Sequence, residues 1–402
     1  MVGGRAPLKR SWTFLRQVGG RPLARLARAY TDRGLPAARR GAAGGQHLVV
    51  LVHGLFGKPA DWRHVVRELE AGLGGRGVRI FVSRTNLLWR TFDGVDVCGA
   101  RLAAEVEALV AAEGAGLETI SFVGHSLGGL IGRYAAGVLS DAESRKMAGL
   151  QPHSFVTIAT PHLGCDASSA TSIHTTETMV PFLAWAAEAP AIGKELGSLV
   201  DRVAVPVSST IFGRTGQQLF LEDRGGGRTG GGEGPLLLSL ASPPVEASGG
   251  RDPPSGRFLA ALASFEHRTC YASIAGDHMV SWSNGSIRRI SELPALSPSG
   301  APGVVRDAYE RGLSPDDAAG GGRPQGGGAR TKAAKTAYRE RILRGLQTLG
   351  WRRVDVHLAS PQLSLPIAVP HNHIQARPPT GAGLAVARHM QAHFAKLGSR
   401  VG

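Results

Sequence analysis

A serine between glycines is the first candidate for chemistry in this sequence. Residues 124–128 read Gly-His-Ser-Leu-Gly, which has the form G-x-S-x-G. A chain with 56 glycines can contain this pattern by chance, so the neighbouring sequence carries more weight. A predicted strand over 119–124 precedes the serine, and a predicted helix over 130–139 follows it. This setting is typical of a nucleophile elbow, so Ser126 is the candidate nucleophile. A glycine-rich turn that binds nothing is the alternative.

Two backbone amides are candidates to stabilise the negative charge that forms on an ester oxygen during acyl transfer. The N–H of Leu127 follows the serine at the start of the predicted helix, whose dipole favours negative charge. The segment 53–57, His-Gly-Leu-Phe-Gly, ends a predicted strand and could supply the N–H of Leu55, or less favourably that of Phe56. His53 could be a metal ligand or a base, but at the end of a buried strand it is more typical of a structural residue.

A serine nucleophile also needs a base, and the base needs a group that orients it. In the elbow-containing folds the order along the chain is serine, acid, histidine. Asp277 directly follows a predicted strand over 269–275 and is the preferred acid, although a turn residue is the alternative. Asp355 lies within a predicted strand and suits the role less. His371 and His373 both follow the last predicted strand, and spacing alone does not separate them as the base.

These residues require a scaffold, and the sequence predicts an alternation of strands and helices. His162 follows one of the predicted strands and is interpreted as structural. The alternation predicts a parallel sheet of the α/β class with helices on both faces. The predicted strands are 48–52, 79–83, 119–124, 155–159, 269–275 and 353–358, and the main predicted helices are 62–69, 97–110, 130–139, 333–349 and 384–397.

The domain organisation follows from where this alternation stops. Residues 46–402 are predicted to form one domain, with a cap over the site at about 165–220. The apolar segment 179–187 within this cap fits a lid and ordinary helix packing equally well. Two Gly- and Pro-rich stretches, at about 224–256 and 294–328, predict flexible surface insertions.

The charge is concentrated in the first 45 residues. The net charge is +15, and residues 1–45 hold nine Arg and one Lys against one acid. This basic amphipathic arm is typical of a transit peptide and predicts a plastid or mitochondrial protein, with a disordered tail on a cytoplasmic protein as the alternative. The remaining residues show no recognised nucleic-acid motif, which argues against a nucleic-acid binder.

The other composition signals are mostly exclusions. Three cysteines stand far apart without a C-x-x-C pair, which argues against a disulfide framework and against a zinc site. No apolar stretch reaches the length of a membrane span.

Several motifs taken together resemble the lipase-like "putative serine esterase" family of eukaryotes, prominent in plants and algae. The resemblance implies an α/β-hydrolase fold with Ser126 as nucleophile, Asp277 as acid and His371 as base. His371 is favoured over His373 because the family's histidine block places the base directly before an Asn. The motifs that carry the resemblance are 51–57, 91–97, 123–130, 159–164, 212–220, 276–282 and 371–374.

The expected function is hydrolysis of carboxylic esters, with lipid acyl esters first among the substrates. The resemblance implies no cofactor and no metal ion. The expected partners are a lipid or other acyl-ester substrate and a membrane contacted peripherally, and no nucleic acid. A non-catalytic α/β-hydrolase-fold module that binds a lipid or a protein is the alternative, because a fold does not fix a function.

Overall fold

The computed structural model describes most of the chain after residue 45. The arm 1–45, the apolar segment 179–187 and most of the expected cap lie outside the described residues. Among the helices of the described part, none combines the length and the apolar character needed to cross a bilayer. The described residues are 46–113, 116–165, 212–223, 234–243, 256–277, 279–296, 301–314, 331–358, 369–377 and 379–396.

A seven-stranded sheet with the order β2-β1-β3-β4-β5-β7-β6 forms the centre of the molecule. All neighbouring strands run parallel except β6, which is antiparallel to β7 at one edge. All six predicted strands are present in this sheet. Its strands are β1 (Gln46–Val52), β2 (Val78–Val82), β3 (Leu117–His125), β4 (Gln151–Ile158), β5 (His267–Ala275), β6 (Gly303–Glu310) and β7 (Trp351–His357).

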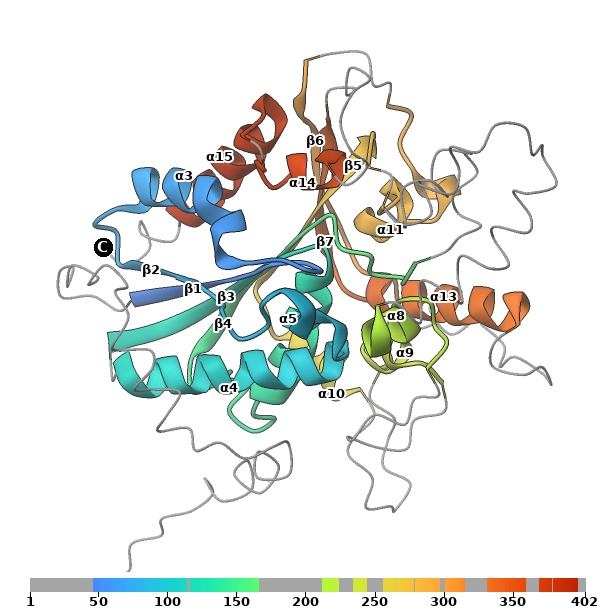
Figure 1. The fold of residues 1–402 in the computed structure, drawn as a ribbon, viewed down its shortest axis with the longest axis horizontal. Helices are drawn as coiled ribbons and strands as arrows, with labels where there is room; N and C mark the ends of the chain where they lie inside the picture. Colours follow the sequence, from blue (N-terminus) through green and yellow to red (C-terminus); the bar gives the residue numbers. More distant parts are fainter. Residues whose placement is uncertain are drawn as a thin grey trace, which may run out of the picture.

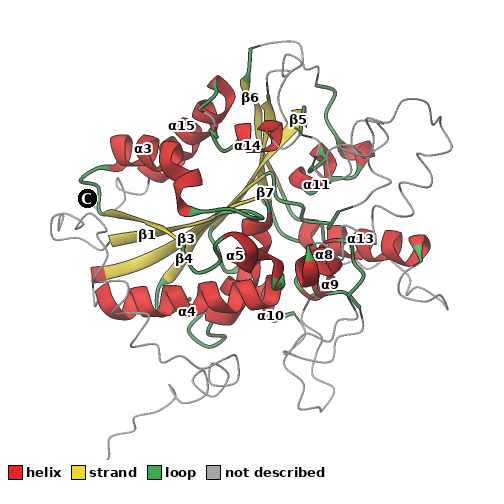
Figure 2. Cartoon of the chain, in the orientation of Figure 1, coloured by secondary structure: helices red, strands yellow, loops and turns green. Residues whose placement is uncertain are grey.

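Helices cover both faces of the sheet, as the alternation predicts. Helices α3 (Arg63–Leu73) and α15 (Gly381–Ala395) lie on one face, whereas α4 (Val95–Glu113), α5 (Leu127–Leu139) and α10 (Arg257–Ala263) lie on the other (Figure 1). Figure 2 shows the same layers by element type, with the strands between the two sets of helices. The remaining helices are α8 (Gly213–Leu219), α9 (Leu236–Ser239), α11 (Trp282–Ser286), α13 (Lys332–Gln347), α14 (Val369–His373) and the 3₁₀ turns η1 (Pro59–Trp62), η2 (Leu88–Phe92) and η4 (Ile290–Glu292).

Strand β1 shows why its sequence is apolar without interruption. Val49 and Leu51 point into the core beneath α3 and α15, whereas Leu48 and Val50 point into the core beneath α4 and α5. All four side chains are completely buried. A strand covered on both faces cannot alternate apolar and polar residues, and each such side chain contributes about 1.5–3 kcal/mol by leaving water.

The predictions for the two Gly- and Pro-rich stretches were wrong over the parts of them that form β6 and α9. Residues 303–310, within the expected insertion 294–328, form the edge strand β6, along which exposure alternates residue by residue. Within the expected insertion 224–256, α9 buries Leu236, Leu237 and Leu238 in the main core. The surrounding glycines lowered the mean apolarity of both stretches, which concealed short segments that pack against the rest of the fold.

Candidate active site

Ser126 lies in a strained turn between β3 and α5. Its backbone has φ 55° and ψ −127°, in the left-handed half of conformational space that a side chain disfavours. The turn is held because the Ser126 N–H donates to the carbonyl oxygen of Ile158 at 2.9 Å. The residue that follows, Leu127, begins α5, so the hydroxyl lies at the positive end of a helix.

The two glycines around Ser126 are required by close backbone approach. A Cβ on Gly124 would lie 2.4 Å from the amide nitrogen of Gly129. A Cβ on Gly128 would lie 2.2 Å from the carbonyl oxygen of Val52 at the end of β1. Because both obstacles are backbone atoms, no side-chain rotation relieves them. The steric reason for the G-x-S-x-G spacing is therefore visible in this turn.

Asp277 and His371 lie in contact although 94 residues separate them. The Nδ1 of His371 lies 2.8 Å from Oδ2 of Asp277, and both side chains are at most 5 % exposed. The other carboxylate oxygen, Oδ1, accepts hydrogen bonds from the backbone N–H groups of Met279 and Val280 at 2.9 and 3.0 Å. These two bonds fix the carboxylate just beyond the end of β5, with one oxygen directed at the imidazole.

His125 connects this pair to the serine. It directly precedes Ser126, and its ring lies 4.9 Å from the ring of His371 between centroids. Its Nε2–H donates to the carbonyl oxygen of His371 at 3.3 Å. Burial, and then the nearby charge of His371, hold the pKa of His125 well below its usual value, so this ring stays neutral. Sequence reasoning did not assign a role to His125, whose only signal was its position inside the serine motif.

The Ser126–His371 hydrogen bond itself is not formed. Nε2 of His371 is buried and has no hydrogen-bond partner among the residues that the structure describes. The free nitrogen is the one opposite Nδ1, so its lone pair is available to accept a proton. Catalytic hydrogen bonds are often long before substrate binds and shorten in the complex, so this geometry is compatible with proton transfer from the serine.

The loop after β1 lies against the serine. A Cβ on Gly54 would be 2.8 Å from the Cβ of Ser126. The Gly57 N–H donates to the carbonyl oxygen of Gly54 at 3.1 Å and closes a tight turn. Within this turn the Phe56 N–H donates to Oγ1 of Thr91 at 2.9 Å, so it is already occupied. This leaves the amide of Leu55, together with that of Leu127, as the candidate oxyanion donor.

Three other residues that the sequence singled out, His53, His162 and Asp355, have structural partners. His53 is buried, and its Nδ1 lies 3.1 Å from the carbonyl oxygen of Gly54. His162 is fully buried and its Nε2 lies 3.0 Å from Oγ1 of Thr157. Asp355 is fully buried and accepts from Arg288 at 2.8 Å. His373 is half-buried in the same short helix as His371, and burial lowers its pKa.

Four aromatic side chains, of which Phe56 and Trp89 are exposed, lie together beside the Gly54–Gly57 turn. Trp89 is 67 % exposed, and its ring lies 4.6 Å from that of Phe56 and 5.5 Å from that of Phe92. Phe92 in turn lies 5.7 Å from Phe212. We call Phe56, Trp89, Phe92 and Phe212 the aromatic cluster. Large aromatic groups at the surface are unusual unless they meet a partner or a lipid.

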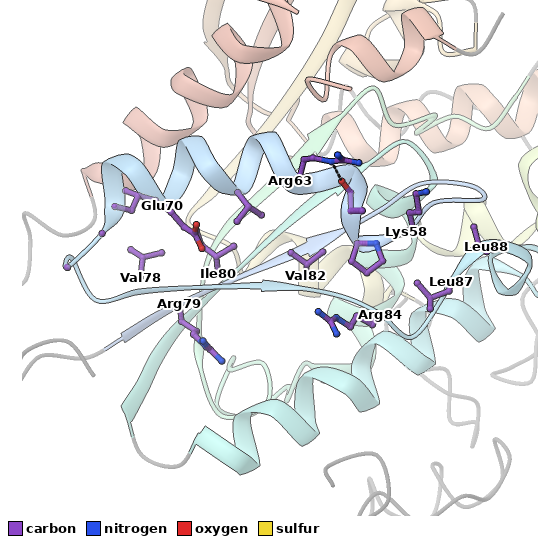
Figure 3. A pocket seen from close by; sticks show the side chains of 16 residues that line it. Lys58, Arg63, Glu70, Val78, Arg79, Ile80, Val82, Arg84, Leu87 and Leu88 are labelled. Carbon is purple, nitrogen blue, oxygen red and sulfur yellow. Dashed lines mark hydrogen bonds between the residues drawn. The ribbon is translucent and has the colours of Figure 1, made fainter. Parts of the chain in front are cut away.

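An apolar groove of about 960 Å³ begins beside this cluster, between α3 and the edge strand β2. Val78, Ile80 and Val82 point from β2 towards α3, and Leu87 and Leu88 close the end nearest the cluster (Figure 3). Lys58, Arg63, Arg79 and Arg84 also line the groove, with Glu70 as the one acid among its lining residues. None of Ser126, Asp277 and His371 lines it, so the groove is separate from the candidate catalytic residues.

Comparison with known proteins gives a family and several relatives. Residues 43–198 match the family model described as "Putative serine esterase (DUF676)". The chain is 28 % identical to "Putative lipase C4A8.10" of Schizosaccharomyces pombe over 276 residues, which are 67 % of this chain and 29 % of that protein. It is 32 % identical to a "Triacylglycerol lipase" of Pseudarthrobacter phenanthrenivorans over 123 residues, which are 30 % of this chain and 35 % of that one.

The matched regions span only 29 % and 35 % of the length of these two relatives. Among solved structures, carboxyl esterase 2 of Tuber melanosporum aligns with a TM-score of 0.33 and 16 % identity, over 61 % of this chain and 62 % of that one. The fold assignment rests on the strand order and on the elbow between β3 and α5. The chain has an α/β-hydrolase fold, and its residues 43–198 match the model of the putative serine esterase family.

Proposed function

We propose that this chain is a serine hydrolase that cleaves carboxylic esters through an acyl-enzyme. The observation that carries the proposal is the 2.8 Å contact between Asp277 and His371, buried beside the strained turn of Ser126. A buried carboxylate–imidazole pair next to a strained serine at the start of a helix is an arrangement suited to activating a hydroxyl.

In the first half of the reaction, Nε2 of His371 takes the proton of the Ser126 hydroxyl while Oγ attacks the ester carbonyl. The carbonyl oxygen becomes an oxyanion, which accepts hydrogen bonds from the amides of Leu127 and Leu55. Asp277 accepts from Nδ1–H of His371, which keeps the lone pair on Nε2 and stabilises the imidazolium. The imidazolium then gives its proton to the departing alcohol as the C–O bond breaks.

In the second half, water takes the place of the alcohol. His371 takes a proton from that water, which attacks the acyl carbonyl, and the same two amides hold the second oxyanion. The proton returns to Oγ of Ser126 as the carboxylic acid leaves. The roles of His371 and Asp277 are the same in both halves, so one hydrogen-bonded pair serves the complete cycle.

We further propose that the substrate is a lipid acyl ester met at a membrane or droplet surface. The aromatic cluster lies beside the Gly54–Gly57 turn, next to the serine. Aromatic side chains suit the boundary between water and lipid, and Lys58, Arg63 and Arg84 of the neighbouring groove suit anionic headgroups, whereas its Arg79 is already paired with Glu113 at 2.9 Å. Two of the relatives carry the word lipase in their names, which is consistent with such a substrate.

A fluorophosphonate probe tests the chemistry, because it reacts only with an activated serine. We expect an adduct on Ser126 in the folded chain and none in Ser126→Ala. Asp277→Asn should keep the fold but lose about 10³–10⁴-fold in kcat, because the amide no longer fixes the tautomer of His371. A folded chain that gives no adduct on Ser126 and no ester hydrolysis would favour a non-catalytic binding module, and hydrolysis that persists unchanged in Ser126→Ala would overturn the role of Ser126.

A further inference from the structure

The opposite end of the sheet gathers histidines that the proposed hydrolysis does not use. His47 at the start of β1, His153 near the start of β4 and His267 at the start of β5 lie together with His393 near the end of α15. The ring centroids of His153 and His267 are 4.9 Å apart, and those of His267 and His393 are 5.3 Å apart. Because parallel strands place their amino ends at the edge away from Ser126, this cluster is remote from the candidate active site.

Two of these histidines, His153 and His267, bring ligand atoms close to the carboxylate of Glu266. Nε2 of His153 lies 3.7 Å from one carboxylate oxygen of Glu266, and Nε2 of His267 lies 3.3 Å from the other. The ligand atoms of His153, Glu266 and His267 all lie within 4.8 Å of one another. The pairing of Ser154 with His267 between β4 and β5 fixes the relative position of their strands.

These separations suit a small divalent ion. Zinc bonds to imidazole nitrogen and carboxylate oxygen at about 2.0–2.2 Å, which places tetrahedral ligand atoms roughly 3.3–3.6 Å apart. The two observed nitrogen–oxygen separations, 3.3 and 3.7 Å, are at or close to this range, but they end on different oxygens of Glu266, so binding through one oxygen requires this exposed carboxylate to rotate. The remaining separation, between the imidazole nitrogens of His153 and His267, is at most 4.8 Å. It can shorten by rotation of exposed side chains, since Glu266 is 50 % and His267 is 41 % exposed. The same exposure gives an ion access from solvent.

A second layer of hydrogen bonds orients the buried ligand. Nδ1 of His153 lies 2.7 Å from Oγ of Ser154, and that hydroxyl lies 2.9 Å from Nε2 of His393. The two distances allow His153 to donate from Nδ1–H to Ser154 and Ser154 to donate to His393. In that tautomer the lone pair of His153 is on Nε2, the atom that faces Glu266. Imidazoles that bind metals characteristically donate from their second nitrogen in this way.

The cation nearest to His393 is Arg352, at 3.5 Å from Nδ1, and its guanidinium is already paired with Asp307 at 2.7 Å. The competing occupant is a proton on His267, which would make a simple ion pair with Glu266.

We propose that His153, Glu266 and His267 form a binding site for a divalent transition-metal ion of the zinc class, with water in the remaining position. Two imidazoles and one carboxylate are ligands that suit zinc, cobalt and nickel rather than magnesium or calcium. The bound ion would link the amino ends of β4 and β5. Its role would be to stabilise the fold, because the proposed hydrolysis occurs at the other edge of the sheet.

The test uses the full chain without a histidine tag, treated with a chelator and then titrated with Co²⁺. We expect one Co²⁺ per chain, with the visible absorption bands of a tetrahedral site, and displacement of those bands by Zn²⁺. Addition of Zn²⁺ should raise the midpoint of thermal unfolding, because the ion binds only the folded chain. The variants His153→Gln, Glu266→Gln and His267→Gln should each weaken binding by at least about tenfold.

A matched control separates this site from non-specific binding to histidine. His64→Gln removes an imidazole from α3, outside the cluster, and should leave the Co²⁺ spectrum and affinity unchanged. Circular dichroism of each variant checks that it is folded. The proposal is overturned if Co²⁺ gives no saturable tetrahedral spectrum, which would point to a protonated ion pair. It is also overturned if the three ligand variants bind Co²⁺ as tightly as His64→Gln does.

Discussion

The ring of His125 is hydrogen-bonded to the backbone carbonyl of His371, not to the imidazole of His371. The Nε2–H of His125 donates to the carbonyl oxygen of His371 at 3.3 Å, and the two rings lie 4.9 Å apart. This bond ties the end of β3, where Ser126 follows, to the short helix α14, on which His371 lies. Since His125 stays neutral, it adds no positive charge that would oppose an imidazolium on His371.

The first prediction concerns this positioning contact. His125→Phe keeps a ring of similar shape but removes the donor, leaving a buried carbonyl oxygen unsatisfied at a cost of about 1–3 kcal/mol. We expect kcat for a soluble ester to fall at least about tenfold with little change in KM, since the contact positions His371 and does not touch substrate. His125→Gln, which restores an N–H donor, should recover part of the loss. Equal kcat in the Phe variant and the unaltered chain would contradict the positioning role.

The second prediction tests the aromatic cluster as a lipid-binding surface. Trp89→Ala removes its most exposed ring. We expect weaker binding to anionic phospholipid vesicles and slower hydrolysis of an emulsified ester, but unchanged hydrolysis of a dissolved short-chain ester. Ile290→Ala, which removes a side chain 79 % exposed in η4, is the matched control and should change neither. A uniform loss on both substrates would show that Trp89 supports the active site rather than lipid contact.

The third prediction compares two glycines of the same helix. In Gly128→Ala the new Cβ would lie 2.2 Å from the carbonyl oxygen of Val52, so the free energy of unfolding should fall by about 1–3 kcal/mol or more. In Gly132→Ala the nearest atom, on Phe155, lies at 3.5 Å, which is ordinary contact. This variant should gain about 0.5–1 kcal/mol, because alanine loses less entropy than glycine in a helix. Urea unfolding of both variants measures the difference.

The fourth prediction is a pH dependence of stability. The pKa of His47 is lowered to about 3 in the fold, from an ordinary value of 6.5. Between these values the unfolded chain binds a proton that the folded chain does not. The free energy of unfolding therefore falls as the pH falls, by about 1.4 kcal/mol per pH unit for this residue.

The variant His47→Gln removes this proton. The slope of its unfolding free energy against pH, measured from pH 6 to 4 with a chelator present, should be shallower than that of the unaltered chain by the contribution of about one proton, which is about 1.4 kcal/mol per pH unit. His393→Gln should behave alike, since the pKa of His393 is also lowered to about 3. Gly132→Ala serves as a control that shifts stability without altering the slope. Identical slopes in all three variants would mean that His47 and His393 titrate normally in the fold.

The sequence by itself determined the elements and the local form of the serine turn. The run 48–52 predicts a buried strand because covered strands are apolar on both faces, and β1 follows that prediction. The spacing of Gly124, Ser126 and Gly128 predicts a tight turn because a Cβ at either glycine would meet backbone. Both inferences succeed because they depend on residues that are close neighbours in the chain. Strand β6 was missed because its pairing partner β7 lies beyond a Gly-rich stretch.

The tertiary structure decided which distant groups meet. The spacing of His371 and His373 did not distinguish between them as the base. Only the folded chain brings Nδ1 of His371 within hydrogen-bond distance of Asp277. Leu55 is preferred over Phe56 because Thr91, 35 residues away, occupies the Phe56 amide. The sequence did not predict the histidine cluster, because His153 and His267 are distant in sequence and meet only where β4 and β5 pair. The spacing of the cysteines was the only pattern from which a zinc site was judged. Strand order sets such contacts, and strand order depends on packing across the whole domain rather than on local sequence.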